Sequence, residues 1–202
     1  MRRIGIFGGT FDPVHNGHMG LAEDAVAQAG LDEVIMVPAK IQPFKQEKKT
    51  ESGEDRFQML ALVASQNDHI TVSRDELDNE GVSYSYLTLR RMQEKNPDAQ
   101  LYFICGSDSF LKVDTWNNAS EILEKYSFIV AGDRPGYRHE ELDAAIKRIQ
   151  DKFNTEIIII KNRQFDVSST EIRDRLAQGK PIDDLVPAPV ERYIIQHGLY
   201  RI

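Results

Sequence analysis

The sequence predicts an α/β fold built on a doubly wound, mostly parallel sheet. Short apolar runs rich in β-forming residues alternate along the chain with longer amphipathic stretches. This alternation favours parallel strands whose connecting helices cover both faces of the sheet. The run Ile157–Ile160, apolar at every position, is typical of a strand covered on both faces. Ligands of such sheets bind beyond the carboxyl ends of the strands, near the point where the strand order reverses.

The expected elements follow in chain order. We expect strands at Arg3–Phe7, Glu33–Val37, Ile70–Ser73, Gln100–Cys105, Ser127–Ala131 and Glu156–Ile160. We expect helices at Met19–Ala29, Glu54–Ser65, Ser85–Glu94, Glu140–Lys152 and Val190–His197. The stretch Pro38–Gly53 lacks clear periodicity and contains several lysines, so a mobile basic loop is expected there. The length suits a single domain over residues 1–202, in which about 180–202 forms a small C-terminal helical cap.

The composition excludes several classes of protein. The chain contains one cysteine, no signal-peptide pattern and no apolar run long enough to span a membrane, so the cytoplasm is the expected location. A formal net charge of −7 gives no general attraction to nucleic acid or to an anionic membrane, and neither is an expected partner. Phosphate substrates would require local cations and backbone dipoles. A homo-oligomer is left open.

The first motif, Gly8-Gly9-Thr10-Phe11-Asp12-Pro13-Val14-His15-Asn16-Gly17-His18, joins a predicted strand to a helix expected to begin at about Gly17. Glycines allow a close approach of backbone to ligand, and a helix N-terminus favours anions. His15 and His18 are three residues apart, so both rings can face one ligand. These residue types predict a site for phosphate oxygens. A tight turn with two surface histidines is the plain alternative.

Other nucleotide and metal motifs fit this string less well. A dinucleotide fingerprint needs G-x-G-x-x-G, whereas the order here is Gly5-x-x-Gly8-Gly9, and no Walker A loop occurs. Zinc would need a third ligand besides His15 and His18, and none is obvious.

The second motif is Val167-Ser168-Ser169-Thr170-Glu171-Ile172-Arg173. Ser168 followed by Glu171 is a capping box, which predicts a helix start. A capped surface helix is the plain interpretation. Three hydroxyls at a helix N-terminus with Arg173 one turn inside can also bind an anion.

The first motif resembles the T/HxGH nucleotidylyltransferases, distant relatives of the class I aminoacyl-tRNA synthetases, and the second resembles their ISSTxxR motif. The resemblance implies a Rossmann-like nucleotidylyltransferase fold in which His15, His18 and Arg173 are catalytic and hold the triphosphate of ATP. The implied ATP-binding residues are Gly8, Gly9, Thr10, Phe11, His15, His18, Gly106, Asp108, Ser168, Ser169, Thr170 and Arg173. Asp108 could bind ribose hydroxyls or Mg²⁺, or cap a helix. Mg²⁺ is expected mainly on the ATP phosphates, without a protein metal site.

Three further resemblances narrow the choice of the compound that accepts the adenylyl group. Histidine at the first position of His15-Asn16-Gly17-His18 resembles the nicotinate/nicotinamide mononucleotide branch of these enzymes. The segment Gly81–Leu89 resembles that family's S-Y-[TS]-x-D-T segment, although Leu87 replaces the Asp. The string from Ile104 to Trp116 is similar to its G-x-D…W pattern. The implied acceptor residues are Lys45, Tyr84, Ser85, Trp116 and Arg134.

The expected reaction is therefore adenylyl transfer from ATP to nicotinate mononucleotide, giving deamido-NAD and pyrophosphate in NAD biosynthesis. Phe44 stands where the family often has His before the lysine of its basic loop. Lys45 and Arg134 could each contact a phosphate or a carboxylate, or be solvated loop charges. Trp116 could stack on a pyridine ring or merely pack. The alternatives are nicotinamide mononucleotide or phosphopantetheine as acceptor, a non-catalytic nucleotide-binding module, and, least favoured, a dehydrogenase.

Overall fold

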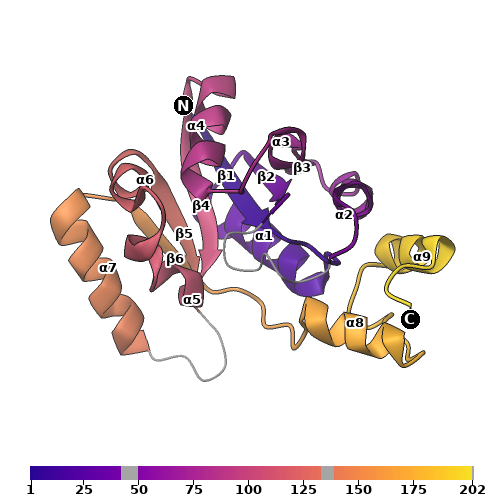
Figure 1. Cartoon of the computed structure of the whole chain (residues 1–202). Helices are drawn as coiled ribbons and strands as arrows, with labels where there is room; N and C mark the ends of the chain where they lie inside the picture. Colours follow the sequence, from indigo (N-terminus) through magenta and orange to yellow (C-terminus); the bar gives the residue numbers. More distant parts are fainter. Residues whose placement is uncertain (42–49, 133–138, 202) are drawn as a thin grey trace.

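The computed structural model describes residues 1–41, 50–132 and 139–201. Its strands form one parallel sheet in the order β3-β2-β1-β4-β5-β6 (Figure 1). They are β1 (Arg2–Gly9), β2 (Glu33–Pro38), β3 (Ile70–Val72), β4 (Ala99–Gly106), β5 (Ser127–Ala131) and β6 (Ile157–Ile160). The predicted doubly wound parallel sheet is confirmed, and its order reverses between β1 and β4.

Helices connect these strands, and every helix predicted from periodicity is present with small shifts at its ends. Their bounds are α1 (Asn16–Ala29), α2 (Gly53–Ala64), α3 (Asp75–Asp78), α4 (Ser85–Lys95), α5 (Ser107–Phe110), α6 (Ala119–Lys125), α7 (His139–Phe153), α8 (Ser169–Ala177) and α9 (Ala188–His197). A 3-10 turn, η1, spans Val113–Thr115. The elements α3, α5, η1 and α6 were not predicted, because they are too short to show a helical period.

Alternate side chains of the central strands enter two separate cores. On β4, Leu101 and Phe103 face the core that contains residues of α4, α6 and α7. Tyr102 and Ile104 face the other core, with α1 and α2. Figure 1 shows α6 and α7 on the opposite side of the sheet from α1. Helices on both faces leave the carboxyl ends of the strands as the open edge.

The run Ile157–Ile160 departs from its prediction. It forms β6, which pairs only with β5 at the edge of the sheet, and Ile159 is 48% exposed. Only Ile160 of this strand is fully buried. An all-apolar run therefore does not identify a doubly covered strand here, because an edge strand lacks neighbours on one side.

The C-terminal helices pack onto the core beneath α1 and α2. Ile172 of α8 and Val190 and Ile194 of α9 belong to this core, and α9 packs against α2. The division into a main body and a cap at about residue 180 stays a prediction. Among the described residues, no helix is long and apolar enough to cross a membrane.

Candidate active site

A cavity of about 1280 Å³ opens at the carboxyl ends of β1 and β4, where the strand order reverses. Gly8 and Gly9 of β1 and Gly106 of β4 line it. A Cβ added at Gly8 or Gly106 would meet no atom within 4 Å. The missing side chains therefore leave both strand ends accessible to a bulky ligand.

The two histidines of the first motif lie at the start of α1 and both line this cavity. The helix begins at Asn16, slightly earlier than predicted, with His15 as its N-cap. The backbone N–H of His15 donates to Nδ1 of His18 at 3.3 Å, and the two rings stack with centroids 3.7 Å apart. An accepting Nδ1 places the proton of neutral His18 on Nε2. The capping contact thus makes the opposite ring nitrogen of His18 a hydrogen-bond donor.

Phe11 supports His18 rather than lining the cavity with its ring. Its side chain is 1% exposed and meets the His18 ring edge-on with centroids 4.9 Å apart. A Cβ on Gly9 would lie 2.9 Å from this ring, so the glycine is needed for the packing. The expected ATP contact of Phe11 remains a prediction for its backbone.

Burial keeps His15 neutral. The residue is 8% exposed, and burial lowers the pKa of His15 to about 4. Its Nδ1 has no hydrogen-bond partner among the described residues. A buried imidazole nitrogen without a partner, at the wall of a cavity, has unused capacity for a ligand.

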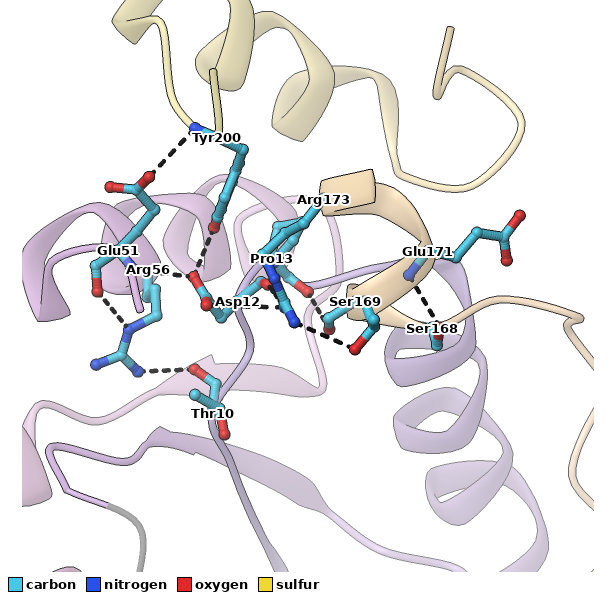
Figure 2. A network of polar contacts seen from close by, with 11 residues as sticks. Thr10, Asp12, Pro13, Glu51, Arg56, Ser168, Ser169, Glu171, Arg173 and Tyr200 are labelled. Carbon is cyan, nitrogen blue, oxygen red and sulfur yellow. Dashed lines mark hydrogen bonds and ion pairs between the residues drawn. The ribbon is translucent and has the colours of Figure 1, made fainter. Parts of the chain in front are cut away.

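The second motif forms the start of α8 and is bonded directly to the first (Figure 2). Ser169 Oγ donates to the carbonyl of Pro13 at 3.0 Å. Arg173 Nη1 donates to the carbonyl of Asp12 at 2.7 Å, and its Nη2 donates to Thr170 Oγ1 at 3.1 Å. Two segments that are 161 residues apart in sequence thereby share one wall of the cavity.

The capping box predicted at this helix start is only half formed. Ser168 Oγ accepts the backbone N–H of Glu171 at 3.2 Å. The Glu171 carboxylate instead accepts from Arg175 at 2.8 Å. The nearby arginine competes successfully because it offers a charge-assisted bond one turn along the helix.

Similarity to known proteins covers most or all of the chain. The family model described as cytidylyltransferase-like matches residues 6–175. A probable nicotinate-nucleotide adenylyltransferase of Clostridium novyi is 37% identical over 201 residues, covering 100% of both chains. One of Moorella thermoacetica is 40% identical, covering 98% of this chain and 92% of the relative.

The chain belongs to the nicotinate-nucleotide adenylyltransferase family. The fold of a Plasmodium falciparum nicotinic acid mononucleotide adenylyltransferase solved with NaAD is also similar, with a TM-score of 0.78 and 22% identity. That likeness covers 99% of this chain and 98% of the other.

The cavity has a further wall that the sequence did not reveal. Residues 162–166, which lie between β6 and the second motif, line it. Arg163 holds this loop against α1, with Nε 2.9 Å from Asp24 Oδ1 and Nη2 2.6 Å from Glu23 Oε2. The ring of Phe165 lies against Gly20, where an added Cβ would be 2.4 Å away. No local sequence pattern predicts these contacts. The residues of α1 that take part look like ordinary helix residues, and Arg163 and Phe165 look like ordinary loop residues.

Of the expected acceptor residues that the structure describes, Tyr84, Ser85 and Trp116, none lines the cavity. Tyr84 and Ser85 lie at the start of α4, and the half-buried Trp116 meets Phe103 edge-on with centroids 5.4 Å apart. Asp108, which is exposed on α5, does not line the cavity either. Lys45 and Arg134 lie outside the described residues, as does half of the predicted basic loop Pro38–Gly53.

Ser83 nevertheless connects the Tyr84 segment to the cavity. Its Oγ accepts the backbone N–H of Lys40 at 3.0 Å, and its own N–H donates to the carbonyl of Ile41 at 2.9 Å. Lys40 and Ile41 both line the cavity. The segment around Tyr84 therefore lies directly behind one cavity wall.

The lowered pKa of His15 predicts a pH-dependent stability. The unfolded chain binds a proton at His15 near the ordinary histidine pKa of 6.5, whereas the folded chain binds it only near a pKa of about 4. Stability from this group is therefore present above pH 6.5 and is lost as the pH falls towards 4. Relative to His15→Asn, the wild type should lose up to about 3 kcal/mol of unfolding free energy over this window.

Urea unfolding of both proteins at intervals between about pH 7 and pH 4.5 measures this difference. Asn is a good N-cap, so the helix start should survive the change. Parallel pH profiles for the two proteins would contradict a neutral, buried His15.

Proposed function

We propose that this chain transfers the adenylyl group of ATP to nicotinate mononucleotide, giving deamido-NAD and pyrophosphate. The observation that carries the proposal is the bonding of the Asp12–His18 segment to the start of α8 at one cavity. This arrangement brings His15, His18 and Arg173 to one place. The relatives named nicotinate-nucleotide adenylyltransferases support the choice of acceptor.

The chemistry requires positioning and charge stabilisation more than proton transfer. The 5′-phosphate of the acceptor is the nucleophile, and its second pKa of about 6 leaves it mostly ionised at neutral pH. It attacks the α-phosphorus of ATP in line, and pyrophosphate leaves. Preorganised donors stabilise the charge that develops on the phosphoryl oxygens. No general base is needed.

The donors come from two helix starts and one arginine. We assign His18 Nε2–H to the α-phosphate region, because its Nδ1 is occupied by the backbone N–H of His15. Arg173 has N–H groups beyond the two that bind Asp12 and Thr170, and it would hold the outer phosphates with Ser169. The N-termini of α1 and α8 add partial positive charge at the same cavity. This local field offsets the acidic net charge.

The remaining contacts divide between nucleotide and acceptor. Gly8 and Gly106 would admit the adenosine, together with the loop 162–166. The Lys40–Ile41 wall and the Tyr84 segment behind it would face the nicotinate mononucleotide, with Lys45, Ser85, Trp116 and Arg134 as further candidates. Asp108 remains a candidate for ribose.

Mg²⁺ would arrive on the nucleotide, because this ion keeps several waters and prefers phosphate oxygens. The described residues contain no cluster of three or more His, Cys, Asp or Glu side chains that could cage it. The metal would supply charge neutralisation on the phosphates, and no step above depends on a protein ligand to it. The cytoplasm is the proposed location, in keeping with a chain that has one cysteine, Cys105, which is a buried free thiol.

The acceptor is tested by pyrophosphate release with ATP and Mg²⁺. Nicotinate mononucleotide, nicotinamide mononucleotide and phosphopantetheine are compared in parallel. We expect the highest kcat/KM with the nicotinate compound. Pyrophosphate release with another acceptor alone would support adenylyl transfer but would reject nicotinate mononucleotide as the acceptor. ATP binding without release from any acceptor would indicate a binding module.

The role of His18 is tested by His18→Ala. Loss of one donor to a developing oxyanion should lower kcat by roughly a hundredfold or more. His69→Ala, which removes an exposed histidine outside the cavity, is the matched control and should retain wild-type turnover. Near wild-type turnover of a folded His18→Ala protein would reject the assignment.

A further inference from the structure

The C-terminal segment reaches the first motif through one tyrosine. After α9, Tyr200 donates its hydroxyl to Oδ1 of Asp12 at 2.8 Å (Figure 2). Its backbone N–H donates to Oε1 of Glu51 at 3.2 Å. Tyr200 has φ 61°, a left-handed conformation that a bulky side chain rarely adopts. A residue persists in such a conformation only where its surroundings hold it.

The partner of this hydroxyl is a buried carboxylate inside the catalytic motif. Asp12 is 3% exposed, and its Oδ1 also accepts the backbone N–H of Glu51 at 3.2 Å. Its Oδ2 lies 3.8 Å from Arg173 Nη1, the single ion pair of Asp12 among the described residues. Burial, reinforced by the charge of Asp12, raises the pKa of Tyr200, so the hydroxyl stays protonated and donates. A buried carboxylate depends on such donors.

Arg173 therefore has two competing acceptors on one residue. It now bonds to the main-chain carbonyl of Asp12 at 2.7 Å and lies beyond hydrogen-bonding distance of the carboxylate. Without the Tyr200 hydroxyl, the carboxylate would lack a strong donor, and the closest cation that could replace it is Arg173. A closed Asp12–Arg173 pair would neutralise the guanidinium and turn it away from an anionic ligand.

We propose that Tyr200 is a positioning residue that holds the Asp12 carboxylate and so keeps Arg173 available to the phosphates of the nucleotide. This inference rests on the proposed function, in which Arg173 contacts the phosphates. It makes the C-terminal segment part of the active-site machinery. The merely structural alternative is that Tyr200 fastens the C-terminus to the body of the protein.

The chain offers a matched control for that alternative. Tyr193 of α9 donates its hydroxyl to Oδ1 of Asp55 in α2 at 3.0 Å. This bond also fastens the C-terminal segment through a tyrosine–aspartate contact, but Asp55 does not line the cavity. Tyr200→Phe and Tyr193→Phe each remove one hydroxyl and nothing else. Melting temperature, KM for both substrates and kcat are measured for both full-length variants.

Tyr200→Phe should lower kcat/KM for ATP by about tenfold or more, as loss of a bond to a charged group would, with the acceptor KM little changed. Tyr193→Phe should stay within about twofold of the wild type. Adding Asp12→Asn to Tyr200→Phe removes the charge that attracts Arg173. The double variant should be more active than Tyr200→Phe alone, a non-additivity that loss of a fastening bond does not produce.

Equal kinetic effects of the two tyrosine variants, or additive loss in the double variant, would overturn the proposal. Calorimetric titration with ATP alone distinguishes failure of the positioning role of Tyr200 from failure of the proposed function. If the wild type released no pyrophosphate from any acceptor, the proposed reaction would fail. Weaker ATP binding by Tyr200→Phe than by Tyr193→Phe would still support the positioning role, and equal binding would refute it.

Discussion

The hydrogen bond from Arg173 to the carbonyl of Asp12 is the constraint on which the site depends. It joins the turn after β1 to the start of α8, segments that are 161 residues apart. The chain between these two segments must therefore return to the same edge of the sheet, at the carboxyl ends of the strands. The strand order does this, because it places β1 at the centre and lets the connection after β6 cross back over α1. Arg163 holds that connection in place through Asp24.

Charge is organised locally in a protein whose total charge is negative. The formal net charge is −7, yet two helix N-termini, two imidazoles and a guanidinium meet at one cavity. His15 is kept neutral by burial, so its contribution is an oriented ring and not a charge. Arg173, Arg163 and Lys40 are the Lys and Arg side chains among the described residues that line this cavity, and Arg173 is the one bonded to both motifs. How this guanidinium is held therefore matters more than the overall composition.

Local sequence patterns predicted the features of the structure that depend on residues close together in the sequence. Periodicity identified the long helices, and the strand at Ser127–Ala131 was placed with the bounds that the structure has. The two motifs were recognised from residue types at fixed spacing. The exposure of Ile159 could not be predicted from the apolar run Ile157–Ile160, because edge position depends on strand order and not on the run itself. Tyr200 and Arg163 could not be found, since their partners Asp12 and Asp24 lie far away in sequence.

We propose that both motifs form a single phosphate site through the geometry of Arg173. Arg173→Lys tests it most directly, because lysine keeps the charge but cannot bind Asp12, Thr170 and a phosphate with one planar group. The measurement is kcat/KM for ATP by pyrophosphate release with nicotinate mononucleotide. We expect kcat/KM for ATP to fall by roughly a hundredfold in a variant that still folds. A value close to the wild type would show that a point charge suffices, and the site would then not depend on the geometry of Arg173.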